Sequence, residues 1–271
     1  MELNDRYYSR FNLEYNPFIK NNCEKFYFES SDVKEVKYKL DYLFKIKGIG
    51  IITGGPGSGK TTAIRNYINN LNKALFKTIY ISMTTLTDND FYRSMVSAFG
   101  HEPKFRKCDN YDLLQQIISG YQTKKITPVI VIDEANYLSR TILNDLKMIL
   151  NFEMDSRDNY ILILSGLPVL ISNLSIASQE PLKQRIIASY TFDSLSKDEV
   201  KLYIEGKIEK AGGSANIFED GVIQTIANYS NGIPRVIDRV MDYALLIADN
   251  KNSSFINKDI MQKAIEQVYI N

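Results

Sequence analysis

The sequence predicts an α/β fold in two parts: a parallel five-stranded sheet flanked by helices, followed by a small all-helical lid domain. Three observations lead to this prediction. Between residues 48 and 192, short apolar runs alternate with longer amphipathic segments, as in successive βαβ units. A glycine-rich run directly follows the first apolar segment. After Phe192 no strong strand pattern remains, and the apolar residues recur at helical spacing.

Five apolar runs are expected to form the strands of the sheet. They are residues 49–53, 78–83, 129–133, 160–165 and 188–192. The middle three are nearly continuous in Val, Ile and Leu, which is typical of parallel strands covered on both faces. Between the strands, Asp88 is suited to cap a helix that ends at Gly100, and Ser139 is suited to begin another.

Four helical segments are expected after the sheet. The run Ser196-Lys197-Asp198-Glu199 is a capping box, and its helix should end at Gly212-Gly213. The second helix is expected over residues 219–230, the third from Pro234 to about residue 249, and the last over residues 258–269. The predicted domains are therefore an N-terminal arm (1–31), an α/β domain (32–193) and a helical domain (194–271). The aromatic-rich arm should pack on one of the other two.

Composition narrows the class of protein. Lys and Arg number 33 and Asp and Glu 32, so composition alone indicates no polyanion binding. Two widely separated cysteines, Cys23 and Cys108, do not suggest a disulfide framework, and a single histidine, His101, excludes a His-rich metal site. The polar N-terminus does not resemble a signal peptide, and no apolar run is long enough to cross a bilayer. A soluble, cytoplasmic protein is expected.

The glycine-rich run has the spacing of a P-loop. It reads Gly54-Gly55-Pro56-Gly57-Ser58-Gly59-Lys60-Thr61 and lies between a predicted strand and a predicted helix. In such a loop, backbone N–H groups surround the β- and γ-phosphates, the lysine adds a positive charge, and the hydroxyl can complete the coordination of Mg²⁺. A glycine-rich turn without a ligand is the alternative, and the strand–loop–helix context argues against it. The motif predicts binding of ATP with Mg²⁺.

A second motif is the apolar strand that ends in Asp133 and Glu134. Parallel strands bring their carboxyl ends to one rim of the sheet, so Asp133 should hold Mg²⁺ through water opposite Thr61. Glu134 should orient and polarise the attacking water. A pair of solvated carboxylates at a strand end is the alternative, which the upstream P-loop makes the weaker reading.

Three further side chains are candidates for the same chemistry. Ser165, at the end of the fourth strand, could bond the γ-phosphate or the water, or simply begin the next turn. Arg185, before the fifth strand, and Arg235, in the helical domain, could neutralise charge that builds on the γ-phosphate. Either could instead be an ordinary surface arginine.

A basic cluster stands apart from these motifs. Lys104, Arg106 and Lys107 surround Phe105 in a predicted loop after Gly100. Such a loop could grip a phosphate backbone, and a solvated run of charges is the alternative.

The order of these motifs resembles that of an AAA+ ATPase. The opening run Phe11-Asn12-Leu13-Glu14-Tyr15-Asn16-Pro17-Phe18, with Asp133-Glu134-Ala135-Asn136 and Gly166-Leu167-Pro168, is similar to the ExeA-like branch. That branch includes ATPases encoded beside transposases, relatives of the bacteriophage Mu B protein, TnsC and TniB. The resemblance covers nearly the whole chain.

The resemblance implies a role for each candidate. Residues 54–61 would be Walker A, with Thr62 also at the nucleotide, and Asp133 and Glu134 would be Walker B and the catalytic glutamate. Ser165 would be sensor 1, where AAA+ proteins commonly carry asparagine. Arg185 would be an arginine finger acting on a neighbouring subunit's ATP, and Arg235 would be sensor 2. The basic contacts to DNA in related ATPases lie roughly where residues 104–107 fall.

The resemblance also implies a function. Such a protein would assemble with ATP into a ring or filament on double-stranded DNA, recruit a DDE-type transposase, and be released by hydrolysis. Two alternatives remain open: a secretion-associated ATPase like ExeA, and a helicase loader. A secretion role would be expected to bring a membrane segment and a cell-wall-binding module, which the sequence does not display.

Overall fold

The chain divides into two compact units. The structure, a computed structural model, describes residues 7–82, 87–149 and 160–270. Within these limits, residues 32–56 and 60–192 form an α/β unit, and residues 7–31, 57–59 and 193–270 form a helical unit.

The α/β unit is built on a five-stranded sheet of order β2-β3-β4-β1-β5, and all neighbouring strands are parallel. Its strands are β1 (Gly48–Gly54), β2 (Phe76–Ser82), β3 (Thr127–Asp133), β4 (Ile161–Gly166) and β5 (Ile186–Phe192). The five predicted strands are confirmed, except that Met83 lies outside the described residues. Each strand therefore sends its carboxyl end to the same rim of the sheet.

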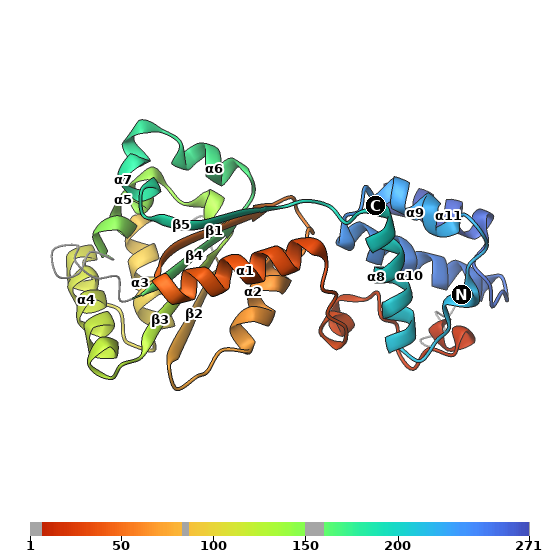
Figure 1. Ribbon diagram of the computed structural model, residues 1–271, viewed down its shortest axis with the longest axis horizontal. Helices are drawn as coiled ribbons and strands as arrows, with labels where there is room; N and C mark the ends of the chain where they lie inside the picture. The colour runs from red at the N-terminus through yellow and green to blue at the C-terminus, as the bar shows by residue number, and fades with distance from the viewer. Residues whose placement is uncertain (1–6, 83–86, 150–159, 271) are drawn as a thin grey trace. The chain divides into compact units, whose positions relative to one another are not determined.

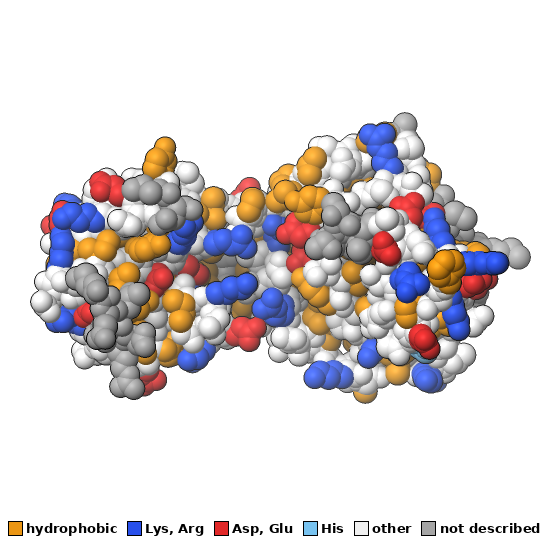
Figure 2. Space-filling model, turned by 180° about the vertical axis from the view of Figure 1, so that it is seen from behind, with side chains coloured by type: hydrophobic (Ala, Val, Ile, Leu, Met, Phe, Trp, Pro, Cys, Tyr) orange, Lys and Arg blue, Asp and Glu red, His pale blue; other side chains and the backbone are white. Residues whose placement is uncertain are grey.

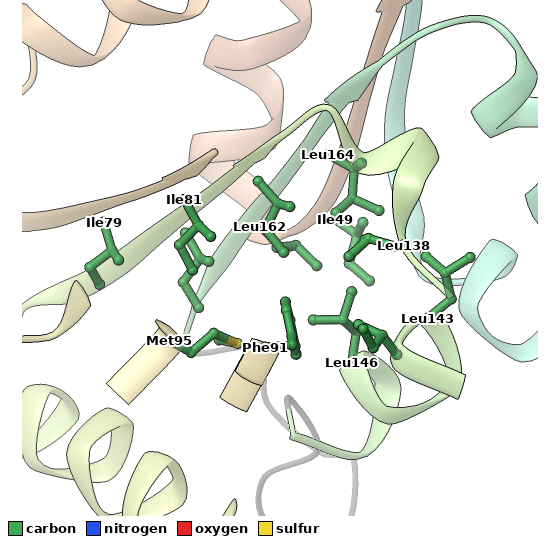
Figure 3. Close-up of a cluster of buried hydrophobic side chains, with 14 of the residues drawn as sticks. Ile49, Ile79, Ile81, Phe91, Met95, Leu138, Leu143, Leu146, Leu162 and Leu164 are labelled. Atoms are coloured by element: carbon green, nitrogen blue, oxygen red, sulfur yellow. The ribbon is translucent and has the colours of Figure 1, made fainter. Parts of the chain in front are cut away.

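Helices cover both faces of this sheet (Figure 1). The helices of the unit are α1 (Ser31–Ile46), α2 (Lys60–Asn69), α3 (Asp88–Ala98), α4 (Lys107–Thr123), α5 (Arg140–Ile149), α6 (Val169–Leu174) and α7 (Glu180–Lys183), with 3₁₀ turns η3 (Ala135–Tyr137) and η5 (Ala177–Gln179). One apolar core joins α1 and α2 to one face of the sheet. A larger core joins α3, α4 and α5 to the other. Figure 3 shows this second core, where Ile81 and Leu162 point from the sheet toward Phe91 of α3 and Leu146 of α5.

The burial of β2 differs from the prediction. β2 was expected to be covered on both faces, but it lies at the sheet edge, where Ile79 and Ile81 are buried and Tyr80 is 52% exposed. β1 is buried along its whole length instead, because β4 and β5 flank it and helices cover both of its faces. Composition alone did not separate the edge strand from a central one.

The predicted cap of α3 is wrong by one residue. Thr87, not Asp88, is the N-cap, and its side chain accepts a hydrogen bond from the backbone N–H of Asp90. Asp88 instead accepts a hydrogen bond of 2.9 Å from the Ser139 hydroxyl. Ser139 does begin the next helix as predicted, since its Oγ accepts from the backbone N–H of Ile142.

The helical unit contains α8 (Lys197–Lys210), α9 (Val222–Ser230), α10 (Pro234–Asn250) and α11 (Lys258–Ile270), with 3₁₀ turns η1 (Tyr7–Phe11), η2 (Lys20–Lys25) and η6 (Ala215–Ile217). The predicted capping box at Ser196 and the first-turn proline of α10 are both confirmed. α9 begins three residues later than predicted, because the backbone near Phe218 pairs with Ile256 instead.

The N-terminal arm packs into the core of the helical unit. Phe11, Leu13 and Phe18 are buried there among the side chains of α8 to α11. The buried amide of Asn16 donates a hydrogen bond of 2.6 Å to Asp242 of α10. These contacts account for the aromatic-rich leader of the sequence. Among the described residues, no helix is long and apolar enough to cross a membrane.

Candidate active site

The P-loop joins β1 to α2 in a conformation that requires glycine. Gly57 and Gly59 have φ angles of +78° and +99°, in the left-handed region that side chains disfavour. A Cβ added at Gly55 or Gly59 would meet no atom within 4 Å. The loop therefore leaves open space beside Gly55 and Gly59, as a cradle for phosphates requires, whereas a Cβ on Gly57 would lie 2.6 Å from the Cβ of Arg235.

Lys60 is the first residue of α2 and lies almost wholly buried, with 8% of its surface exposed. Its Nζ donates hydrogen bonds of 2.9 Å and 3.0 Å to the carbonyls of Gly54 and Gly55. The ammonium group stands at the positive end of a helix dipole, so an anion there is favoured on two counts.

The loop also holds an unsatisfied polar atom. The Oγ of Ser58 is buried and has no hydrogen-bond partner among the described residues. A buried hydroxyl without a partner is costly, and a phosphate oxygen in the loop would supply an acceptor.

Asp133, at the end of β3, collects four hydrogen bonds. Its Oδ2 accepts from Thr61 Oγ1 at 2.9 Å and from the phenol of Tyr80 at 2.7 Å. Its Oδ1 accepts from Ser165 Oγ at 2.8 Å and from the backbone N–H of Glu134 at 3.0 Å. The three hydroxyls come from α2, β2 and β4, so Asp133 lies where these elements meet.

These bonds determine the charge of the carboxyl group. Burial by itself raises the pKa of Asp133, but the hydrogen bonds from Tyr80, Ser165, Thr61 and the backbone outweigh it, and the pKa lies below its usual value. Burial, the hydrogen bond to Asp133 and its negative charge together raise the pKa of the Tyr80 phenol, which therefore remains a donor. Asp133 is an anion near neutral pH.

Glu134 follows Asp133 at the end of β3. It is exposed, and its φ and ψ of 54° and 35° are left-handed, which costs a non-glycine residue of the order of 1–3 kcal/mol. A glutamate held in this way at a strand end has its carboxylate free to meet solvent at the rim of the sheet.

Asn136 fixes the neighbouring end of β4. Its Oδ1 accepts a hydrogen bond of 2.8 Å from the backbone N–H of Leu167. A Cβ on Gly166 would lie 2.5 Å from the same oxygen, so only glycine permits this approach. The bond ties the turn after Glu134 to the turn after Ser165.

The two candidate arginines belong to different units. Arg185 lies between α7 and β5 in the α/β unit and is partly exposed. Arg235 is exposed in the first turn of α10 in the helical unit. The other candidates form two clusters in the α/β unit. Lys60 bonds the loop carbonyls, and Asp133 bonds Thr61 and Ser165. The two clusters meet in the first turn of α2, where Lys60 and Thr61 are adjacent.

A buried side chain holds the backbone of the basic loop between α3 and α4 by hydrogen bonds. The buried side chain of Asn110 accepts from the backbone N–H of Lys104 and donates to the carbonyls of Lys104 and Arg106. The side chains of Lys104, Phe105 and Arg106 are exposed, Phe105 by 88%. Basic and hydrophobic side chains lie side by side over this end of the α/β unit in Figure 2.

Lys107 differs from its neighbours in the loop. Its Nζ forms an ion pair of 2.5 Å with Asp145 of α5 and lies 5.1 Å from the centre of the Tyr92 ring. Its charge is thus largely neutralised within the fold, while Lys104 and Arg106 extend outward.

Sequence reasoning missed Tyr80, Asn110 and the hydrogen bond of Asn136. Each is a polar side chain within an otherwise ordinary strand, helix or turn. An alternating pattern in β2, with Tyr80 between two isoleucines, was the one available signal that its phenol faces away from the main core.

The residues of this site fit a nucleoside triphosphate with Mg²⁺. The described residues contain no cluster of three or more His, Cys, Asp or Glu side chains that could hold a metal alone. Mg²⁺ is usually held by one or two carboxylates together with substrate phosphates and water. Thr61 and Asp133 match that requirement, and Lys60 and the loop match the phosphates.

The sheet order, the P-loop and the aspartate at the end of β3 together define an AAA+ fold of the P-loop class. Residues 45–174 match the family described as AAA domain. The chain is similar to General secretion pathway protein A of Aeromonas hydrophila, with 29% identity over 94% of this chain and 47% of that protein. It is also similar to a potential ATP-binding protein of Staphylococcus aureus, with 25% identity over 90% of this chain and 97% of that protein. The chain thus spans about half the length of the first relative.

Solved structures share the fold. The Aeropyrum pernix ORC1 protein in complex with DNA matches with a TM-score of 0.69 and 14% identity, over 93% of this chain and 68% of that one. CDC6P of Pyrobaculum aerophilum matches with a TM-score of 0.68 and 17% identity, over 96% and 70%. The Thermotoga maritima RuvB branch migration motor matches with a TM-score of 0.58 and 20% identity, over 88% and 69%. At these identities the likeness concerns the fold alone.

Proposed function

We propose that this chain is a Mg²⁺-dependent ATPase that hydrolyses ATP to ADP and phosphate and acts on DNA in its ATP-bound form. The observation that carries hydrolysis is the convergence of the Thr61 and Ser165 hydroxyls on Asp133, with an exposed glutamate next in the chain. Thr61 and Asp133 would hold Mg²⁺, which when bound offsets the charge of the phosphates.

Residues of the chain would bind the phosphates, activate the water and orient Asp133. Lys60 would turn its ammonium group from the neutral loop carbonyls to the charged phosphates, which are stronger acceptors. Glu134, whose carboxylate meets solvent, would orient the attacking water and accept its proton. Ser165 would keep Asp133 in place from the other side.

Binding to double-stranded DNA is supported by the loop of Lys104 and Arg106. Hydrogen bonds from within hold its backbone, and its charged side chains are exposed. A loop whose backbone is held in advance loses less entropy when its cations meet a phosphate backbone. With a net charge of only +1, the chain would depend on such a local surface for binding.

Self-association and the recruitment of a DDE-type transposase complete the proposal. Both rest on the family resemblance of the motifs, in which a neighbouring subunit's arginine completes each site. Arg185 would be that residue, and Arg235 would contact the nucleotide from the helical unit. A ring or filament on target DNA would then present the surface that the transposase meets.

A second candidate function is supported by one observation. The similarity to General secretion pathway protein A spans nearly the whole of this chain, and it favours a secretion-associated ATPase. In that case the ATPase site would be the same, and the basic loop would have no DNA to bind.

Two measurements on the purified protein separate these functions. Phosphate release is followed with and without Mg²⁺, and the anisotropy of labelled double-stranded DNA is followed with ATP, with ADP and without nucleotide. We expect Mg²⁺-dependent hydrolysis and DNA binding that requires ATP and weakens steeply with salt. Hydrolysis without DNA binding would favour the secretion role, and absence of hydrolysis would overturn both.

A further inference from the structure

Tyr80 contacts the proposed Mg²⁺ site from the edge strand. It lies two residues before Ser82, which is paired with Asp133 in the register of β2 and β3. Residues two apart in a strand share a face, so the phenol of Tyr80 reaches forward to Asp133. Its hydroxyl donates to Asp133 Oδ2 at 2.7 Å, the shortest of the four hydrogen bonds to this carboxylate.

The four bonds use the whole accepting capacity of Asp133. A carboxylate offers about four lone-pair positions, and each oxygen here accepts two hydrogen bonds. On Oδ2 the two donors are Thr61 and Tyr80. Thr61 is also a proposed ligand of Mg²⁺, so its hydroxyl would leave Asp133 when the metal binds. Tyr80 is then the donor that stays on Oδ2.

We propose that Tyr80 is a positioning residue of the Mg²⁺ site, which holds Asp133 Oδ2 in place when Thr61 turns to the metal. This inference rests on the proposed ATPase function. It concerns the orientation of Asp133 and assigns Tyr80 no contact with ATP.

The surroundings of the ring allow the hydroxyl to be removed without disturbing the core. Tyr80 lies in the wall of a cavity of about 660 Å³ between α2 and β2, which also reaches Thr61 and Asp133. The side chain is half exposed and lies on the opposite face of β2 from the buried Ile79 and Ile81. Tyr80→Phe therefore removes one hydrogen bond and opens no buried void.

The chain offers a matched control in Tyr67 of α2. Its phenol donates a hydrogen bond of 2.8 Å to the carboxylate of Asp41, in the same chemical pairing as Tyr80 with Asp133. Tyr67→Phe removes an equivalent bond that has no part in the Asp133 cluster.

The test measures metal affinity and activity separately. Mn²⁺ is titrated into the ATP-loaded protein and followed by electron paramagnetic resonance, and the Mg²⁺ dependence of hydrolysis is measured in parallel. In Tyr80→Phe we expect the affinity for Mn²⁺ to fall about tenfold, as loss of one hydrogen bond to a charged group implies, and the Mg²⁺ needed for half-maximal hydrolysis to rise equally. ATP affinity without metal should be unchanged, and Tyr67→Phe should match the wild type.

Two unnatural side chains distinguish loss of the hydrogen bond from a folding defect. Replacing Tyr80 by 4-aminophenylalanine keeps a donor in place and should restore metal affinity, whereas 4-methylphenylalanine fills the space without a donor and should not. Wild-type affinity in Tyr80→Phe, or an equal loss in Tyr67→Phe, would overturn the inference and leave the ATPase proposal standing. If the wild type takes up no metal with ATP, both are overturned.

Discussion

Thr61 and Asp133 are 72 residues apart in the sequence, and Thr61 Oγ1 donates a hydrogen bond of 2.9 Å to Asp133 Oδ2. β1 and β3, which lead to these two residues, are not adjacent, since β4 lies between them. The same order brings Ser165, at the end of β4, to the other oxygen of Asp133. The carboxylate is thus oriented before any ligand arrives, which lowers the cost of binding a metal ion.

Lys60→Ala should abolish ATP binding. The ammonium group is buried at the start of α2, and its loss removes a charge-assisted bond to phosphate of about 1.5–3 kcal/mol, together with the charge that offsets the anion. We expect ATP affinity to fall at least about a hundredfold by calorimetry in Mg²⁺ buffer. Lys60→Ala on its own should form no ATP-dependent oligomer, because none of its sites would hold the nucleotide. Thr62→Ala serves as a control for folding of the first turn, with a smaller loss.

Glu134→Gln should retain ATP binding and lose hydrolysis. The amide cannot accept the proton of the attacking water, and the exposed side chain makes few contacts whose loss would unfold the protein. We expect turnover to fall about a hundredfold or more, with ATP affinity within about twofold of the wild type. The assembled, ATP-bound state should accumulate, as size-exclusion chromatography can measure. Normal turnover would remove Glu134 from the role of base.

The strands and most helices could be predicted because their patterns are local. The apolar runs, the capping box at Ser196 and the proline of α10 each report on a few neighbouring residues. Which strand lies at the edge depends on the order of the sheet, and no local pattern encodes that order. β2 was therefore assigned the wrong degree of burial.

The candidate site shows the same division. Its motif residues could be named from spacing, but Tyr80 joins them only through the pairing of β2 with β3. In the sequence Lys107 does not differ from its basic neighbours. Its ion pair with Asp145 arises only from the packing of α4 against α5. The Asn110 side chain holds the loop by three hydrogen bonds to the loop backbone, and no sequence pattern predicts these bonds.

Glu199→Gln should remove a pH-dependent contribution to stability. Burial by itself raises the pKa of Glu199, but hydrogen bonds from Ser31 and Ser196 outweigh it, and the pKa lies below its usual value. A lowered folded-state pKa stabilises the protein above the ordinary value of about 4.3, and this contribution is lost as the pH falls through the folded pKa. We expect the variant to lose less than about 1 kcal/mol at pH 7, because the group is partly exposed, and the difference from the wild type to vanish as the pH falls below the folded pKa. Urea unfolding across this range measures the difference.

Lys104→Ala with Arg106→Ala should weaken DNA binding and flatten its salt dependence. If each residue contacts one phosphate, the slope of log K against log salt should fall by about 2. Lys107→Ala is the matched comparison, because its charge is already paired with Asp145 and its removal should change the slope less. Equal salt slopes in the double variant and the wild type would place the DNA contacts elsewhere.

Arg185→Ala should lose hydrolysis while each subunit still binds ATP, if this arginine acts on the ATP of a neighbour. The strongest form of the test mixes two inactive proteins. Lys60→Ala subunits cannot bind ATP but retain Arg185, whereas Arg185→Ala subunits bind ATP but lack the arginine. In a mixed assembly, the nucleotide site of an Arg185→Ala subunit would meet Arg185 of an adjacent Lys60→Ala subunit. Hydrolysis should therefore reappear on mixing. It should rise as the proportion of Lys60→Ala increases and then fall. An arginine that served its own subunit would give no recovery at any ratio, and unchanged turnover in Arg185→Ala alone would exclude a role in hydrolysis.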